Sequence, residues 1–271
     1  MNVVIFVPEV HFHAPVVMKE LFEHFKDGSV RFNVVLTPKI SSNKKSSASL
    51  SKVIKDSGIK YLVLMILLKI KFDLFRMMEK IFFRPSESRK YMSPVDVCLG
   101  YGISYMVTEN VNSRETVEYV KEIGPDIILS LFFNQILKPE LLQTASKRCL
   151  NLHPSMLPEY KGMSPILWML SDGASKGGIT LHEMTSSLDS GNIISQKEFE
   201  ISGPDSFFTV YRKAAFAGAA LLVDFLSPSN TASSDIPQPE EGQIYGPITR
   251  ESLDLLLKKH SFLRFRSKDL R

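Results

Sequence analysis

The feature that most constrains the fold is a set of short apolar runs, rich in β-branched residues, that alternate with helix-like segments. The runs are NVVIFV (residues 2–7), RFNVVL (31–36), IILSLFF (127–133) and CLNL (149–152). Continuous apolar strands of this kind are typical of parallel sheets that are buried on both faces. The intervening segments carry apolar residues at helical spacing. The alternation therefore predicts an α/β fold with a mostly parallel sheet and right-handed crossovers.

Composition narrows the class of protein. The 271 residues are 44% hydrophobic and 23% charged, as in ordinary soluble globular proteins. The net charge of +4 is too small to indicate nucleic-acid binding by itself, and it is concentrated after Arg250. Cys98 and Cys149 lie in apolar stretches, so we expect free thiols in a reducing compartment. The first residues lack a basic leader and a cleavage site, and we expect a cytoplasmic protein.

Composition shifts also predict the domain organisation. We expect a catalytic domain over 1–226, a Pro- and Ser-rich linker over 227–241 and a basic C-terminal extension over 242–271. The Ser/Lys-rich segment 39–58 is expected to be a mobile loop that leads into a helical insertion at about 55–85. The apolar run of that insertion, 61–68, is too short to span a membrane. We expect its wide apolar face to pack on the domain or to form a homodimer contact, with shallow membrane association as the alternative.

The sequence NLHPSMLPEYKGMSP (151–165) follows a predicted strand and contains the first candidates for chemistry. Ligands of parallel sheets bind at the carboxyl ends of the strands. Asn151 and His153 alternate on one strand end, so their side chains point the same way. An imidazole can take up a proton near neutral pH, and an amide N–H can stabilise an oxyanion. Asp189, in SSLDSGN, could orient the imidazole and raise its pKa. The alternative is a pair of polar caps on a strand end.

Together these motifs resemble a known family. The stretch from Pro125 to Gln196, with NLHPSMLPEYKGMSP and SSLDSGN, is similar to the core of the folate-dependent formyltransferases. That group includes the glycinamide ribonucleotide, methionyl-tRNA and nucleotide-sugar enzymes. The resemblance implies a Rossmann-like fold and transfer of a formyl group from N10-formyltetrahydrofolate to a primary amine, without a metal. By match, His153 is the general base, Asn151 stabilises the tetrahedral oxyanion, and Asp189 fixes the imidazole.

The same resemblance implies which residues bind the two substrates. The pterin is expected to lie between two loops, formed by Phe133, Asn134, Gln135, Ile136 and Leu137 and by Met184, Thr185, Ser186 and Leu188. The acceptor is expected to contact Ser155, Met156, Lys161 and Met163. The loop that carries His11 and His13 leaves the first strand at the edge where ligands bind, so these two residues are expected to line the acceptor pocket. The pair HFH lacks a third ligand, so we expect no metal there. Trp168 is expected to be a packing residue.

Departures from the family pattern bear on the acceptor. VPEVHFHAP, which follows the first strand, lacks the glycines of the phosphate loop of the glycinamide enzymes. About forty-five residues follow Leu226, fewer than the folded C-terminal domain typical of the tRNA enzymes. His182, in TLHEM, stands where the tRNA enzymes usually lack histidine. We therefore expect an amino-deoxy sugar on a nucleotide diphosphate as acceptor. The alternatives are a methionyl-tRNA formyltransferase, a formyltetrahydrofolate hydrolase and a non-catalytic folate- or sugar-binding module.

Overall fold

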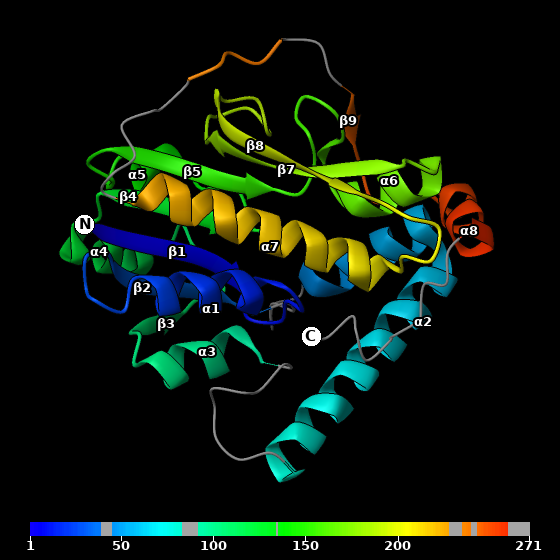
Figure 1. The fold of residues 1–271 in the computed structure, drawn as a ribbon, viewed down its shortest axis with the longest axis horizontal. Helices are drawn as coiled ribbons and strands as arrows, with labels where there is room; N and C mark the ends of the chain where they lie inside the picture. Colours follow the sequence, from blue (N-terminus) through cyan, green and yellow to red (C-terminus); the bar gives the residue numbers. More distant parts are fainter. Residues whose placement is uncertain (39–44, 83–91, 134, 228–234, 240–242, 260–271) are drawn as a thin grey trace.

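A seven-stranded sheet organises the chain (Figure 1). The computed structural model describes residues 1–38, 45–82, 92–133, 135–227, 235–239 and 243–259. The strands lie in the order β3-β2-β1-β4-β5-β7-β8. Their bounds are Asn2–Pro8 (β1), Arg31–Thr37 (β2), Tyr105–Val107 (β3), Ile127–Leu131 (β4), Arg148–His153 (β5), Lys176–Glu183 (β7) and Ile193–Glu200 (β8).

The direction of the strands confirms the predicted sheet. β1, β2, β3, β4 and β5 pair in parallel, whereas β7 pairs antiparallel with both β5 and β8. Every residue of β4 is buried, which explains why its sequence is apolar except for Ser130. The carboxyl ends of β4 and β5 are adjacent, since Ser130 is the register partner of Asn151. This edge of the sheet is where a ligand of an open parallel sheet binds.

Helices cover both faces of the sheet, as expected. On one face, α1 (Ala14–His24) and α7 (Phe207–Leu226) pack on the larger hydrophobic core, and α3 (Pro94–Tyr101) packs beside α1. Figure 1 shows α7 crossing this face of the sheet. On the other face, α4 (Arg114–Ile123) and α5 (Pro139–Leu142) cover the smaller core that contains Val4, Phe6 and Ile128. The prediction of a mostly parallel α/β fold is confirmed.

The insertion differs from the expectation at its start. α2 runs over Lys45–Phe82, so the predicted loop over 39–58 is wrong for residues from 45 onward, while 39–44 lie outside the described residues. The helix breaks once, at Gly58, whose φ of 81° is non-helical. Arg250 donates from Nη2 to the carbonyl oxygens of Ile54 and Lys55 at 3.1 and 3.4 Å. These bonds join α8 to the helical turn that precedes the break, and local composition could not predict such a distant contact.

The C-terminal segment returns to the sheet edge. β9 (Ile244–Tyr245) pairs in parallel with β6 (Lys161–Gly162), directly after the loop that follows β5. Next to this pair, α6 (Pro165–Asp172) packs on α8 (Arg250–Lys259). Ile248, Leu253 and Leu256 of the returning segment are buried in the larger core. The described part of the predicted extension is therefore packed on the catalytic fold, and how the chain divides into domains stays a prediction. Residues 260–271 lie outside the described residues.

Candidate active site

Asn151 is the centre of a polar cluster at the carboxyl end of β5. Its Oδ1 accepts a hydrogen bond of 2.6 Å from the hydroxyl of Ser130 on β4. Of the two terminal atoms of the Asn151 amide, only Oδ1 can accept a hydrogen bond, so this bond fixes which side of the amide group faces Ser130. The Nδ2 group consequently lies 3.0 Å from Nε2 of His182 and 3.4 Å from Oδ1 of Asp189. The first N–H group of Asn151 is held firmly by His182, whereas the longer bond leaves the second one weakly held.

His153 is buried two residues further along and has two different ring nitrogens. Its Nε2 lies 3.0 Å from the backbone oxygen of Tyr160. A carbonyl only accepts, so Nε2 carries the hydrogen and Nδ1 keeps the free lone pair in the neutral ring. Nδ1 lies 3.6 Å from Oδ2 of Asp189. Burial lowers the pKa of His153 below its usual value, and the Asp189 carboxylate opposes this shift. The imidazole is therefore neutral at pH 7 and can accept a proton at Nδ1.

Asp189 links the two catalytic candidates. Burial raises the pKa of its carboxyl, but the interactions with His182, His153 and the N–H of Gly162 outweigh burial and lower the pKa to about 2. The Gly162 N–H donates to Oδ2 at 2.9 Å. Asp189 is thus a carboxylate at neutral pH, positioned to stabilise a proton gained by Nδ1 of His153. The structure brings together all three residues for which the sequence predicted a catalytic role.

His182, on β7, is a fourth member of the cluster that sequence reasoning did not place in the site. It is 2% exposed, and its Nδ1 lies 2.8 Å from the carbonyl oxygen of Glu183, so Nδ1 carries the hydrogen. Nε2 is then the acceptor that faces Asn151, and it also lies 3.6 Å from Oδ1 of Asp189. The pairing of β7 with β8 shifts register between Leu181 and His182. Bulges of this kind re-aim side chains near active sites.

Backbone strain gathers around the same cluster. Among the described residues, the non-glycine residues with positive φ are Phe132, Tyr160, Ser164 and Asp189. Phe132 directly follows β4, Tyr160 and Ser164 flank β6, and Asp189 has a φ of 47°. Each such conformation costs about 1–3 kcal/mol and persists only where surrounding contacts enforce it. The hydrogen bond from Gly162 and the contacts with the two histidines are the constraints that hold Asp189.

A cavity of about 100 Å³ opens from this cluster. Asn151, His182 and Asp189 lie at its polar end, and the two loops predicted to hold a pterin form its apolar walls. Phe133, Leu137, Met184 and Leu188 line it, as do Gln135, Ile136, Thr185 and Ser186. Gln135 ties its loop to residues 109 and 111 through two hydrogen bonds. Asn134 lies outside the described residues. Apart from Asn134, the predicted cofactor residues all line one cavity, while their binding role stays a prediction.

The predicted acceptor residues are more dispersed. Ser155 is fully buried, and its hydroxyl donates to the carbonyl oxygen of Glu159 at 2.7 Å, so it shapes the turn and has no open path to a ligand. Lys161 is 4% exposed within β6, whereas Met163 is 53% exposed. Met156 is partly buried over Gly178. Of these four side chains, Met163 is the one most open to solvent beside the site.

His11 and His13 lie in an aromatic cluster between β1 and α7. The His11 ring stacks on Phe132 at 4.8 Å, and its Nδ1 accepts from the N–H groups of His13 and Ala14. The His13 ring stacks on Tyr211 at 5.0 Å, and burial lowers its pKa well below the usual value. His11 lines a separate cavity of about 290 Å³ near α2, whereas His13 is buried. Within the described residues, no three His, Cys, Asp or Glu side chains form a group that could hold a metal ion.

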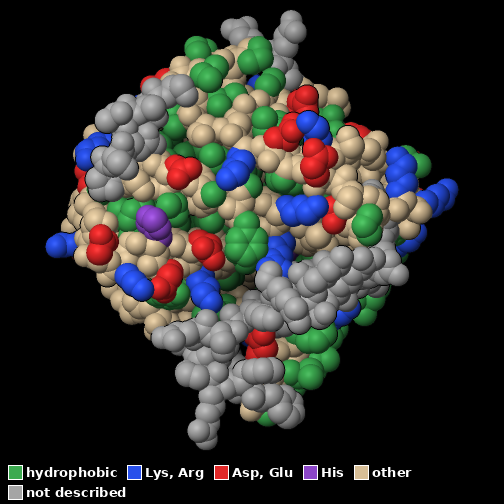
Figure 2. Space-filling view, in the orientation of Figure 1, with side chains coloured by type: hydrophobic (Ala, Val, Ile, Leu, Met, Phe, Trp, Pro, Cys, Tyr) green, Lys and Arg blue, Asp and Glu red, His purple; other side chains and the backbone are tan. Residues whose placement is uncertain are grey.

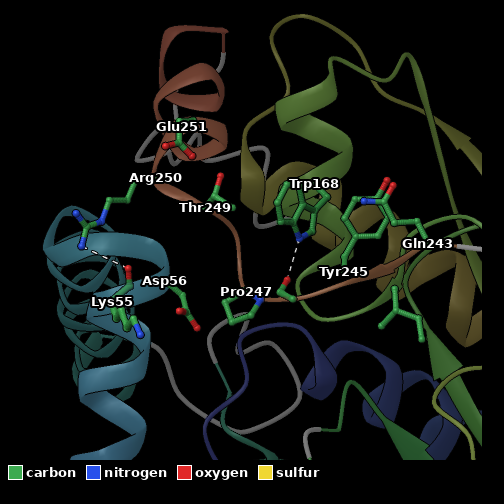
Figure 3. Close-up of a pocket in the computed structure, with 11 residues that line it drawn as sticks. Lys55, Asp56, Trp168, Gln243, Tyr245, Pro247, Thr249, Arg250 and Glu251 are labelled. Atoms are coloured by element: carbon green, nitrogen blue, oxygen red, sulfur yellow. Dashed lines mark hydrogen bonds between the residues drawn. The ribbon is translucent and has the colours of Figure 1, made fainter.

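A larger pocket lies beside the site, where the C-terminal segment returns (Figure 3). Its volume is about 600 Å³. Trp168 and Tyr245 form an aromatic wall with ring centroids 5.1 Å apart, and Tyr245 in turn lies 5.3 Å from the ring of Tyr160. The Nε1–H group of Trp168 donates a hydrogen bond of 3.0 Å to the carbonyl oxygen of Gly246, in the loop before α8 (Figure 3). Charged side chains of both signs complete the lining, namely Lys55, Asp56, Arg250 and Glu251. Trp168 is a packing residue, as predicted, and it also faces this pocket.

The two cysteines are free, as predicted. Burial raises the pKa of Cys98 to about 12 and that of Cys149 to about 11, so both stay protonated at neutral pH. A protonated thiol is a poor nucleophile. The described helices include none that is long and apolar enough to cross a membrane.

The neutral imidazole of His153, the weakly held amide N–H of Asn151 and the carboxylate of Asp189 together offer the base and the hydrogen-bond donor that an acyl transfer needs. Residues 82–226, more than half of the chain, match the formyl transferase family. The chain belongs to this family, whose members are enzymes that transfer formyl groups.

Individual relatives support the assignment. Methionyl-tRNA formyltransferase of Bacillus subtilis (strain 168) is 36% identical over 178 residues, which are 64% of this chain and 56% of the relative. The chain spans about half the length of the curated relatives it matches. A sugar N-formyltransferase from a Shewanella species has the same fold, with a TM-score of 0.56 at 20% identity over 98% of this chain and 90% of its own. An N-formyltransferase from Helicobacter canadensis, solved with folinic acid and dTDP-3-aminofucose, is similar to the chain with a TM-score of 0.55 at 17% identity. The match covers 90% of this chain and 71% of that one.

Proposed function

We propose that the chain transfers a formyl group from N10-formyltetrahydrofolate to a primary amine on a nucleotide-linked amino sugar. The observation that carries the proposal is that Asn151 and Asp189 meet at the polar end of a cavity walled by two loops, and that Nδ1 of His153 lies 3.6 Å from the Asp189 carboxylate. The arrangement supplies a base and a hydrogen-bond donor for an acyl transfer and requires no covalent enzyme intermediate.

The lining of the cavity, though not its present volume, suits the pterin end of the folate. Its walls are apolar side chains, of which Phe133 and Met184 come from opposite loops, and such walls suit a flat heterocycle. The volume of about 100 Å³ is small for a two-ring system, so the loops must separate when it enters. Ile136 is 72% exposed and Leu188 is 47% exposed, so both can move without opening the core. Bound there, the folate supplies an activated formyl group.

His153 acts as the base in this proposal. The attacking amine must lose a proton as its bond to the formyl carbon forms. Nδ1 of His153 accepts that proton, since Nε2 already carries a hydrogen bonded to Tyr160. Asp189, 3.6 Å from Nδ1, stabilises the resulting imidazolium. When the bond between the formyl carbon and the leaving nitrogen breaks, Nδ1 of His153 would return the proton to that nitrogen, so that tetrahydrofolate leaves neutral and the imidazole is restored.

Asn151 supports the negative charge that develops on the formyl oxygen. Its Nδ2 group directs one N–H to His182 at 3.0 Å and the other to Asp189 at 3.4 Å. The second, weaker bond is the one that can be redirected to the oxyanion. Ser130 and His182 hold the amide plane from both ends. A donor whose direction is fixed before reaction needs little reorganisation when the charge appears.

The pocket at the C-terminal segment is our candidate for the nucleotide end of the acceptor. Its aromatic wall of Trp168 and Tyr245 can stack on a base, and Lys55 and Arg250 can approach a diphosphate. Tyr160 connects this wall to the catalytic cluster, because its ring packs on Tyr245 and its backbone oxygen accepts from His153. A small acceptor that spans both places would place its amine near His153.

A methionyl-tRNA formyltransferase is the second candidate, because the curated relatives described above carry that activity in their names. The discriminating experiment measures formyl transfer and tetrahydrofolate release with a panel of nucleotide-linked amino sugars and with methionyl-tRNA. We expect turnover on an amino sugar, and replacement of Trp168 by leucine should raise the KM for the sugar by about 5–150-fold, the range of one lost stacking contact. Turnover on methionyl-tRNA alone would establish the second candidate.

The same assay tests the two remaining alternatives. A hydrolase would release formate at the same rate without any amine, whereas we expect release to depend on the acceptor. A binding module would bind folate and turn over with none of the acceptors. Either result would overturn the transferase proposal.

The pH dependence of the reaction follows from the pKa of His153. Because burial holds this pKa below 6.5 and the base must be neutral, kcat should stay constant at neutral pH and fall on the acidic side, with a midpoint below pH 6.5. Asp189 raises the pKa of His153. Replacement of Asp189 by asparagine should therefore move the midpoint to lower pH while the plateau of kcat also falls. A midpoint that moves upward would contradict this assignment.

His182 should act through Asn151, whose amide it holds in place. Replacement of His182 by phenylalanine removes the acceptor of the Asn151 N–H, and we expect kcat to fall by about 10-fold or more, as for a misdirected hydrogen-bond donor. A glutamine at position 182, which restores an acceptor, should recover part of kcat. Unchanged kinetics in the phenylalanine variant would exclude this role.

A further inference from the structure

The second half of α2 is apolar on two opposite faces. One face packs on the body of the protein through Leu68 and Phe72, which are at most 8% exposed. The opposite face carries nine large hydrophobic side chains that are 42–66% exposed: Ile59, Val63, Ile66, Leu67, Ile70, Leu74, Met77, Met78 and Ile81. Figure 1 shows this part of α2 extending away from the sheet, and Figure 2 shows hydrophobic side chains at the same edge. Monomeric proteins rarely expose a contiguous stripe of this kind.

The spacing along the stripe indicates a second helix as its partner. Val63, Ile70 and Met77 repeat every seven residues, as do Leu67, Leu74 and Ile81. A repeat of seven keeps one seam of a helix in contact with another helix over several turns. Between Ile59 and Ile81 the helix is about 33 Å long, which is long enough for three heptads.

The pattern is also symmetric, and the symmetry identifies the partner. The seven positions 59, 63, 66, 70, 74, 77 and 81 are separated by 4, 3, 4, 4, 3 and 4 residues, which is the same order in both directions from Ile70. Two antiparallel copies crossing at Ile70 would therefore bring every one of these positions opposite an apolar one. Ile59 would meet position 81 of the second copy, Val63 would meet position 77 and Ile66 would meet position 74. Such self-matching is the requirement of a two-fold symmetric interface.

The charges beside the stripe favour protein over lipid. Lys60 pairs with Asp254 of α8 at 2.5 Å, Lys69 pairs with Asp73, and Arg76 pairs with Asp96 of α3 at 3.5 Å. Helices that lie on membranes use basic flanks to attract anionic lipids. Here Lys60, Lys69 and Arg76 are already paired with carboxylates of the same chain, which weakens that attraction, and burial against a protein surface can leave these pairs intact.

We propose that the chain forms a two-fold symmetric homodimer by antiparallel packing of the exposed faces of α2, with the axis near Ile70. This surface lies on the insertion, and the proposal does not depend on the function proposed above. It also assigns to a second copy the face that the sequence suggested could form a homodimer contact.

The mass of the full-length chain in solution, by sedimentation equilibrium, is the first test. We expect a dimer at micromolar concentration, and replacement of Ile70 by glutamate should weaken it at least 100-fold because two carboxylates would meet at the axis. Leu99 of α3, 66% exposed and outside the stripe, provides the control, and L99E should dimerise normally. Circular dichroism should be unchanged in I70E, since Ile70 is 59% exposed. A monomeric wild-type chain, or an I70E variant that dimerises as well as L99E, would overturn the proposal.

Cysteine cross-linking tests the direction of packing. A mixture of I59C and I81C chains should form a mixed disulfide dimer, whereas I70C alone should form a symmetric one. Disulfides within I59C alone, at the expense of the mixed product, would mean parallel packing and would overturn the antiparallel arrangement. Sedimentation of a monomeric chain with anionic phosphatidylserine vesicles, but not with neutral phosphatidylcholine vesicles, would assign the stripe to a membrane surface instead.

Discussion

Replacement of His153 by alanine is expected to lower kcat by about 10²–10⁴-fold, the usual contribution of a general base. Nδ1 of His153 is the nitrogen with a free lone pair in the neutral ring, and Asp189 lies 3.6 Å from it. Without the imidazole, the amine would have to lose its proton to water. The KM for N10-formyltetrahydrofolate should change by no more than a few fold, because the apolar walls of the cavity come from other residues. Steady-state kinetics with both substrates give the two values separately.

The control for His153 is His24, an exposed residue at the end of α1. H24A should match the wild type in kcat and in both KM values. Because His153 is buried, the alanine variant must also be compared by urea unfolding, which separates lost catalysis from lost structure. Retention of kcat within tenfold would show that another group takes the proton. A folded variant that no longer binds folate would make His153 part of the binding scaffold.

Gly162 is the site of the second large effect, because replacement by alanine should damage both the fold and the reaction. Its φ of 98° disfavours a side chain, and an added Cβ would lie 2.4 Å from the backbone oxygen of Tyr245. β6 and β9 must therefore separate, and the N–H of Gly162 would move away from Asp189. The strain alone costs about 1–3 kcal/mol. Misplacement of Asp189 by about 1 Å should lower kcat by about 10²-fold.

Gly246 provides a matched control on the same returning segment. A Cβ added there meets nothing within 4 Å, so G246A should retain stability and kcat. Urea unfolding and kcat should be measured for both variants. If G162A unfolds like the wild type and keeps its kcat, the pairing of β6 with β9 does not hold the catalytic carboxylate.

The strands and the triad could be predicted from the sequence because each depends on a local pattern. β1 and β4 are buried along almost their whole length and β2 over its last four residues, so these segments are mostly apolar, and β5 is apolar at the positions that face the core. Asn151 and His153 follow from the alternation of side chains on β5, and the family resemblance supplied Asp189. The cavity walls followed from the same resemblance, since the two loops lie at the carboxyl edge of the sheet.

The remaining features depend on contacts between distant parts of the chain. His182 lies on a strand whose register shifts beside it, and no local pattern predicts a bulge. β6 and β9 have two residues each, too few for any periodicity to be visible. Residues 45–57 are Ser- and Lys-rich, a composition that suggested a loop, but they form the first part of α2. Arg250, far along the chain, donates hydrogen bonds to the carbonyl oxygens of Ile54 and Lys55 in this part. For α2 the sequence indicated a wide apolar face, but not which of its residues the body of the protein covers, because that division depends on tertiary contacts.

The pairing of β6 with β9 has a consequence for how the protein is made. The sheet from β1 to β8 and the residues of the catalytic cluster are all synthesised before Ile244 and Tyr245. During synthesis the N-terminal part of a chain folds first. The loop carrying Gly162 can then gain its partner strand only when the returning segment has emerged. The nascent chain would thus pass through a stage with a complete sheet and an unfinished site, in which the carboxylate of Asp189 is not yet held in place.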